Sequence, residues 1–143
     1  MAKVKIDNKL VAAVRIRGRV NVRQSIAETM NRLNLKRVNS LSLIYGTKSN
    51  VGMINKCKDF ITFGEIDRKV LERLLESKGI KVEKDNMDKL MNGAVRAADA
   101  GIRLPMGMKP PKRGYKDIKR SFVDKGDLGY RGVEINALIE RMI

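Results

Sequence analysis

The stretch LVAAVRIRG, residues 10–18, decides how the rest of the chain is interpreted. It is an apolar run of strand length that becomes basic where it ends. In an extended strand, the even-numbered side chains from Leu10 to Ile16 share one face and the odd-numbered ones from Val11 to Arg17 share the other. A helix over the same residues would be apolar on every side and would not segregate the arginines. The stretch therefore predicts a sheet with one face packed by helices and one face directed toward a polyanion.

Two further strands and three helices are predicted between this strand and residue 79. Asn21 and Gln24 have the spacing of a capping box. The following helix carries an apolar stripe at residues 22, 26, 30 and 33, which indicates core packing. Next come a strand at Ser40–Tyr45, a short helix capped by Thr47, and a strand at Asp59–Gly64. A third helix then runs from a cap at residue 67 to a stop at residue 79.

The sequence changes character after residue 80. Asn86–Ala100 has the pattern of a helix, whereas residues 101–126 show no sustained period and contain all three prolines. Seven basic residues and one acidic residue lie between positions 103 and 120. A segment this long without periodicity is unusual inside a compact domain, so we interpret it as a basic extended arm shaped by a partner, with a disordered tail as the alternative. A last amphipathic helix ending near Met142 indicates that the chain returns to the body.

Composition narrows the classes of partner and chemistry. The formal charge is +15 with no histidine, which favours nucleic acid or an anionic surface as partner. One cysteine and no histidine exclude an intrachain disulfide, a Ser-His-Asp or Cys-His pair, and a zinc site built on His and Cys. We expect no metal or other cofactor, and we expect Cys57 to be buried. No apolar run approaches the roughly 20 residues that span a bilayer, and no targeting segment precedes the first strand, so the sequence predicts a cytoplasmic protein without membrane contact.

Five stretches together resemble one family. They are VRIRG (residues 14–18), the helix of residues 21–35, GMINKCKDFITFGE (52–65), PPKRG (110–114) and LGYRGVEINALIERM (128–142). In this order the chain resembles large-subunit ribosomal protein L-thirty, in the longer form of archaea that is related to eukaryotic L-seven. Bacterial relatives often carry an arginine before the Gly-Met pair, where this chain has Val51, and Lys48 and Lys56 are the available substitutes.

The resemblance implies a fold and a role. The fold is α+β: a strand–helix–strand–helix–strand core with a three-stranded antiparallel sheet in the order 3-1-2 and helices on one face. A C-terminal helix, the basic arm and a terminal helix complete it. We therefore divide the chain into an RNA-binding core at residues 1–80 and an extension at 81–143. The implied role is structural: binding large-subunit rRNA near the 5S rRNA, beside neighbouring large-subunit proteins, on cytoplasmic ribosomes.

The candidate RNA-binding residues are mostly cations, because rigid RNA is recognised through phosphates, 2′-hydroxyls and shape. On the core they lie around the first strand and at the entry to the second. On the extension they follow the arm, where Tyr115 is a candidate for stacking. The full set is Arg15, Arg17, Arg19, Arg23, Arg37, Asn39, Lys48, Lys56, Arg103, Lys109, Lys112, Arg113, Tyr115, Lys116, Lys119, Arg120 and Arg131.

Two other functions are weighed against this one. A sequence-specific DNA-binding regulator would need two consecutive helices on a tight turn. Only the helices at residues 69–79 and 86–100 are consecutive, and their connection is longer than that motif uses. An enzyme is disfavoured because no nucleophile–base pair, metal-ligand cluster or phosphate-binding glycine loop is present.

Overall fold

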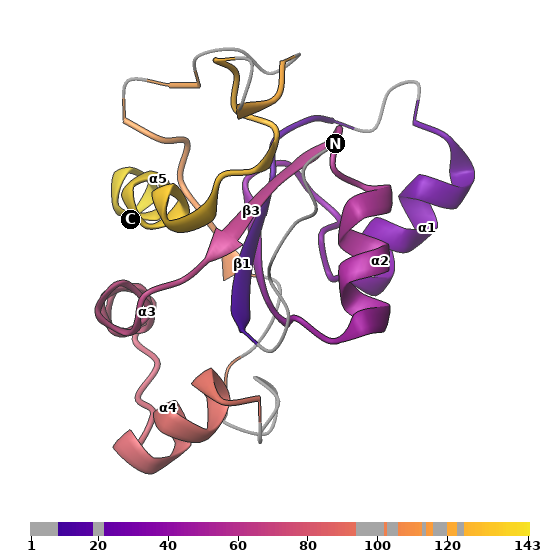
Figure 1. Cartoon of the computed structure of the whole chain (residues 1–143). Coiled ribbons are helices and arrows are strands. Elements are labelled where there is room, and N and C mark those ends of the chain that lie inside the picture. Colours follow the sequence, from indigo (N-terminus) through magenta and orange to yellow (C-terminus); the bar gives the residue numbers. More distant parts are fainter. Residues whose placement is uncertain are drawn as a thin grey trace.

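The protein is built from a central sheet with helices on both sides (Figure 1). The computed structural model describes residues 9–18, 22–93, 102, 106–112, 114–115, 120–122 and 125–143. A short 3-10 helix at Gly132–Glu134 leads into the last helix. The other elements are, in order, β1 (Leu10–Arg15), α1 (Gln24–Arg32), β2 (Ser40–Tyr45), α2 (Lys48–Lys56), β3 (Ile61–Glu65), α3 (Arg68–Ser77), α4 (Lys84–Met91), β4 (Met106–Gly107), β5 (Gly129–Tyr130) and α5 (Ile135–Met142).

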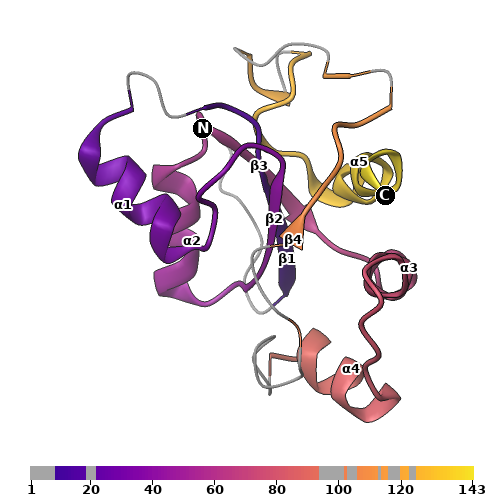
Figure 2. The ribbon, with the colours of Figure 1, turned by 180° about the vertical axis from the view of Figure 1, so that it is seen from behind.

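The sheet has five strands in the order β4-β2-β1-β3-β5. β1 lies in the middle and pairs antiparallel with β2 and β3, as expected for the inner three strands. The prediction of a three-stranded, fully antiparallel sheet is wrong. β4 extends the β2 edge antiparallel (Figure 2). β5 joins the β3 edge in parallel. Each added strand is two residues long, and a strand of that length has no periodicity that a sequence can display.

Helices cover both faces of the sheet, so the prediction of helices on one face is also wrong. All six residues of β1 are buried. The face of Leu10, Ala12 and Val14 packs against α3 and α5, and the face of Val11 and Ala13 packs against α1 and α2. The physical reason is that both side-chain parities of β1 are largely apolar, and each needs cover from water.

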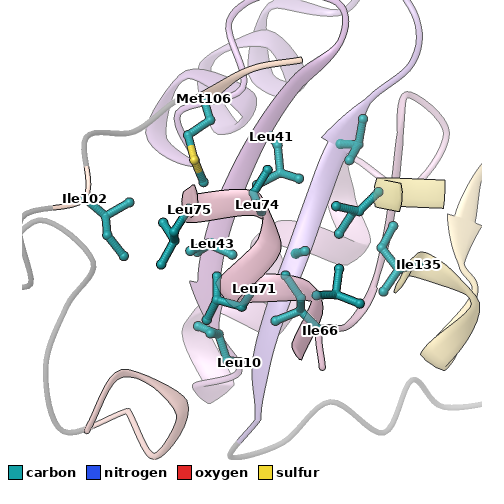
Figure 3. Close-up of a cluster of buried hydrophobic side chains, with 14 of the residues drawn as sticks. Leu10, Leu41, Leu43, Ile66, Leu71, Leu74, Leu75, Ile102, Met106 and Ile135 are labelled. Atoms are coloured by element: carbon teal, nitrogen blue, oxygen red, sulfur yellow. The ribbon is translucent and has the colours of Figure 1, made fainter. Parts of the chain in front are cut away.

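The larger core cluster joins the first strands to the C-terminal part of the chain (Figure 3). Leu71 and Leu74 of α3 meet β1 and β2 there, and Ile135 of α5 closes the same cluster. Ile102 and Met106, from the segment interpreted as an extended arm, are 1% and 4% exposed. The described part of that segment therefore contributes to the core.

The second cluster lies between the sheet and helices α1 and α2. Met30 and Leu33 from the predicted stripe of α1 are buried against Ile54 of α2 and Phe63 of β3. Cys57 lies among them with no exposed surface, which confirms its predicted burial. Each sheet face thus has its own apolar layer.

Some helix ends lie where the sequence predicts them, and others do not. Thr47 caps α2, and its hydroxyl accepts a hydrogen bond from the Asn50 amide at 3.2 Å. α1 begins at Gln24 with Arg23 in the capping position, so the predicted capping box does not start this helix. α4 ends at Met91 instead of continuing to residue 100, because Gly93 adopts φ +78°, a left-handed conformation that stops a helix. Residues 94–101 lie outside the described part of the chain.

Candidate nucleic-acid interface

Several basic segments meet at one end of the sheet. β1 ends where β2 and β3 begin, since Val14 pairs with Leu41 and Arg15 pairs with Ile61. The loops after β1 and before β2 and β3 therefore lie together, in the upper part of Figure 1. We call this region the basic end and define it by the exposed or half-buried cations Arg17, Arg23, Arg37, Lys56, Lys58, Lys109 and Arg120.

Arg17 is held against an aromatic ring at the basic end. The backbone amides of Ile16 and Arg17 donate hydrogen bonds of 3.0 and 3.2 Å to the Phe60 carbonyl. The Arg17 guanidinium carbon lies 5.2 Å from the centre of the Phe60 ring. Phe60 is half-buried, so this contact orients Arg17 beside solvent.

Arg15 turns inward and is 3% exposed, which corrects its predicted place on a surface open to RNA. Its Nε donates to the Arg17 carbonyl at 2.9 Å, and its Nη1 donates to the carbonyls of Leu35 and Lys36 at 2.9 and 3.1 Å. Nη2 donates to the Gly18 carbonyl at 3.3 Å. Buried carbonyl oxygens need donors, and Arg15 supplies them to the loops after β1 and before β2.

Asn39 and Tyr115 also bond within the protein. The Tyr115 hydroxyl donates to Oδ1 of Asn39 at 2.8 Å, and the Tyr115 ring packs against the larger core cluster. Burial, reinforced by Asp127, raises the pKa of Tyr115 to about 12, so the hydroxyl keeps its proton at neutral pH. The predicted stacking side chain is therefore half-buried and already engaged with Asn39.

Arg131 is 6% exposed and belongs to a buried polar cluster, not to the surface predicted for it. Its Nη2 donates to the Asp127 carboxylate at 3.1 Å, and its Nε donates to the Thr62 hydroxyl at 2.7 Å. Its guanidinium carbon lies 5.0 Å from the centre of the Phe122 ring. Burial lowers the pKa of Arg131, and the hydrogen bond to Asp127 opposes that shift.

The part of the chain that carries α3 and α4 is electrically balanced. The stretch from Glu65 to Met91, which includes α3 and α4, holds seven acidic and seven basic residues. Arg68 bonds to Glu72 and Asp88, and Arg73 bonds to Glu140 at 3.0 Å. The net positive charge of the chain therefore comes entirely from residues outside this stretch.

Comparisons with known proteins show the family of the chain. A family model described as ribosomal protein L30p/L7e matches residues 11–61, which run from β1 to the start of β3. "Large ribosomal subunit protein uL30" of Nanoarchaeum equitans is 41% identical over 94% of this chain and 99% of its own length. The proteins of the same name from Methanosphaera stadtmanae and Thermoplasma acidophilum are each 34% identical over 94% of this chain, and over 100% and 93% of their own lengths. The chain belongs to the L30p/L7e family.

The remaining predicted residues of this L30p/L7e chain divide into three groups. Arg17, Arg23, Arg37, Lys56, Lys109 and Arg120 come together at the basic end, and Lys112 is exposed nearby on the same segment as Lys109. Lys48 lies at the opposite end of α2 from Lys56. The residues outside the described part of the chain are Arg19, Arg103, Arg113, Lys116 and Lys119.

Sequence reasoning missed Lys58. Lys58 lies in the turn between α2 and β3, two residues after Lys56, and that spacing was the available signal. Among the residues that the structure describes, there is no group of three acidic, cysteine or histidine side chains placed to hold a metal ion. No helix in the same described ranges is long and apolar enough to cross a membrane.

Proposed function

We propose that this protein is a structural, non-catalytic component of the large ribosomal subunit in the cytoplasm, and that its basic end binds large-subunit rRNA. The observation that supports this most is the gathering of exposed cations from separate chain segments at one end of a rigid sheet. The names of the uL30 relatives support the ribosomal assignment. A position near the 5S rRNA and contacts with neighbouring proteins belong to the same proposal, on the strength of the family resemblance.

The chemistry of this surface suits the backbone of folded RNA. Arginine forks and lysine ammonium groups neutralise phosphates, and these contacts set position without reading bases. The loop before β2 is fixed by hydrogen bonds from Arg15 to the carbonyls of Leu35 and Lys36, so Arg37 is presented on a firm support. The balanced α3–α4 side has no comparable excess of positive charge and would face away from the RNA.

The salt dependence of binding tests the proposal. Each phosphate contact contributes about 0.7–0.9 to the slope of log affinity against log salt concentration. We expect R23Q/R37Q/K56Q to reduce the slope for a large-subunit rRNA transcript by about two. The matched variant K69Q/K81Q/K84Q removes the same charge from α3, α4 and their connection and should leave the slope unchanged.

Two outcomes would contradict the proposal. Equal loss of slope in both triple variants would mean that binding follows total charge and has no preferred surface. Tighter binding to duplex DNA than to the rRNA transcript at matched salt would favour the DNA-binding alternative. That alternative has little support in α3 and α4, which are separated by residues 78–83 and carry balanced charge.

A further inference from the structure

The segment from residue 108 to residue 115 begins and ends on the same residue, Asn39. The Met108 amide donates to the backbone carbonyl of Asn39 at 2.9 Å. Seven residues later, the Tyr115 hydroxyl donates to Oδ1 of Asn39 at 2.8 Å. We call residues 108–115 the Asn39-anchored loop; its residue 113 lies outside the described part of the chain.

Asn39 is suited to this position by its backbone and by its side chain. It adopts φ +62°, a left-handed conformation that asparagine tolerates better than most residues. Its amide donates to the Arg15 carbonyl at 2.8 Å, which fixes it to the end of β1. The backbone amide, the backbone carbonyl and the side-chain oxygen of this one residue thus bind three different parts of the chain.

The middle of the loop is fixed as well. Pro110 and Pro111 restrict its backbone, and Pro111 is buried. The Gly114 amide donates to the Pro111 carbonyl at 3.0 Å, which closes a turn. The Lys112 amide donates to the Arg141 carbonyl of α5 at 3.0 Å. The loop is therefore attached to the body at both ends and at its centre.

The loop presents positive charge beside the basic end. Lys109 and Lys112 are exposed, and the anchor Asn39 follows Arg37 by two residues. β4, immediately before the loop, extends the sheet from β2, so the loop leaves the sheet at the edge where β2 begins (Figure 2). Lys109 continues the cationic surface that starts at Arg37, and Lys112 extends it toward α3 and α5, where it borders Glu76 and Glu140.

We propose that Asn39 and Tyr115 are positioning residues, which hold this loop preassembled so that Lys109 and Lys112 bind RNA phosphates together with the basic end. This inference rests on the proposed function and assigns both residues a role other than direct RNA contact. A flexible loop loses conformational entropy when it binds, whereas a loop ordered during folding has already lost it. Releasing the anchor would weaken RNA binding while leaving the lysines in place.

Single-atom and single-side-chain variants test the anchor. Y115F removes only the donor, and N39G removes the acceptor while keeping a residue that adopts positive φ. We expect each variant to weaken binding to a large-subunit rRNA transcript by about three- to tenfold, which is the effect of losing one hydrogen bond that orders a contact. Each should also lower the slope of log affinity against log salt concentration toward the slope of K109Q/K112Q. Y130F is the matched control, because the Tyr130 hydroxyl donates a hydrogen bond of 2.7 Å to Glu65 at the other edge of the sheet. We expect Y130F to bind the transcript as tightly as the unmodified protein does.

A double-mutant comparison separates positioning from general loss of structure. In the K109Q/K112Q background, Y115F should cause no further loss of affinity, because the lysines that Tyr115 positions are gone. Thermal unfolding of Y115F should resemble that of Y130F, which keeps the test valid even where N39G folds poorly.

Three results would overturn the inference. The first is unchanged binding by Y115F and N39G while K109Q/K112Q weakens it, which would mean that the loop contacts RNA without needing its anchor. The second is the same loss of affinity on Y115F substitution in the unmodified protein and in the K109Q/K112Q background. The third is no effect of K109Q/K112Q while R23Q/R37Q/K56Q lowers the slope. In all three the proposed function stands, whereas its own failure would appear as no effect of R23Q/R37Q/K56Q or as an equal loss of slope in K69Q/K81Q/K84Q.

Discussion

Arg15 and Arg131 lie inside the protein because buried oxygen atoms around them need hydrogen-bond donors. Arg15 donates to four backbone carbonyls in two loops, and Arg131 donates to the Asp127 carboxylate and the Thr62 hydroxyl. A guanidinium has five N–H groups in a fixed plane, so one side chain can satisfy several acceptors. Positive charge in the sequence therefore does not translate directly into positive charge at the surface.

The buried ion pair of Arg131 and Asp127 gives the first prediction. Both side chains are 4% exposed, so D127A would leave an uncompensated cation in the interior. We expect it to lower the free energy of unfolding by about 3–5 kcal/mol, measured by urea denaturation. E140Q, which breaks the exposed pair with Arg73, should cost less than about 1 kcal/mol. Similar small losses in both variants would show that the Asp127 pair contributes no more than a surface pair.

Burial of Cys57 predicts slow thiol chemistry. Desolvation raises the pKa of the Cys57 thiol from 9.0 to about 11, although Lys56 and Arg15 act in the opposite direction. Only the thiolate reacts, so at pH 8 the folded protein should react with a disulfide reagent at least about 100-fold more slowly than the unfolded chain. The folded thiol also holds its proton more tightly, so this group should reduce stability as the pH rises from 9.0 to about 11. Equal rates before and after denaturation would contradict the burial.

At the scale of elements, the last helix lies directly on β3, and a glycine makes room for it. A methyl group at Gly64 would lie 2.0 Å from the Gly132 carbonyl oxygen and 3.0 Å from the Ile135 Cβ. We expect G64A to destabilise the protein by at least about 2 kcal/mol, because backbone atoms cannot move aside cheaply. Gly52 of α2 is the matched control: a methyl group there would have no atom within 4 Å, so G52A should stabilise the helix by up to about 1 kcal/mol. Thermal unfolding of both variants measures the difference, and equal shifts would mean that α5 does not pack this closely.

The elements with strong local patterns were predictable, and the rest were not. The stripe of α1, the alternation of β2 and the Thr47 cap each leave a pattern within a few residues. β4 and β5 are too short to leave one, and they form because β2 and β3 offer unpaired edges. At the basic end, the exposed cations on element termini were predicted, whereas the inward turn of Arg15 depends on carbonyls about 20 residues away in the chain. The apolar side chains on both faces of β1 were the available signal for helices on both faces.

At the scale of the whole molecule, the C-terminal part completes the core that the N-terminal part begins. Ile135, Leu138 and Ile139 of α5 share one cluster with Leu10 and Val14 of β1. β4 and β5 meanwhile cover the two outer edges of the sheet. The division into units at residues 1–80 and 81–143 stays a prediction, and this shared core makes it testable.

A fragment of residues 1–80 should not fold cooperatively on its own. It would keep α3 but lose α5, so β1 and β3 would expose apolar side chains on one face, and the sheet would have two uncovered edges. We expect it to bind the hydrophobic dye ANS strongly and to unfold in urea over a broad range, whereas the full chain should bind little dye and unfold in one transition. A fragment that unfolds as sharply as the full chain without binding the dye would establish residues 1–80 as an independent domain. In that case the described packing of α5 would add stability to a core that already folds without it.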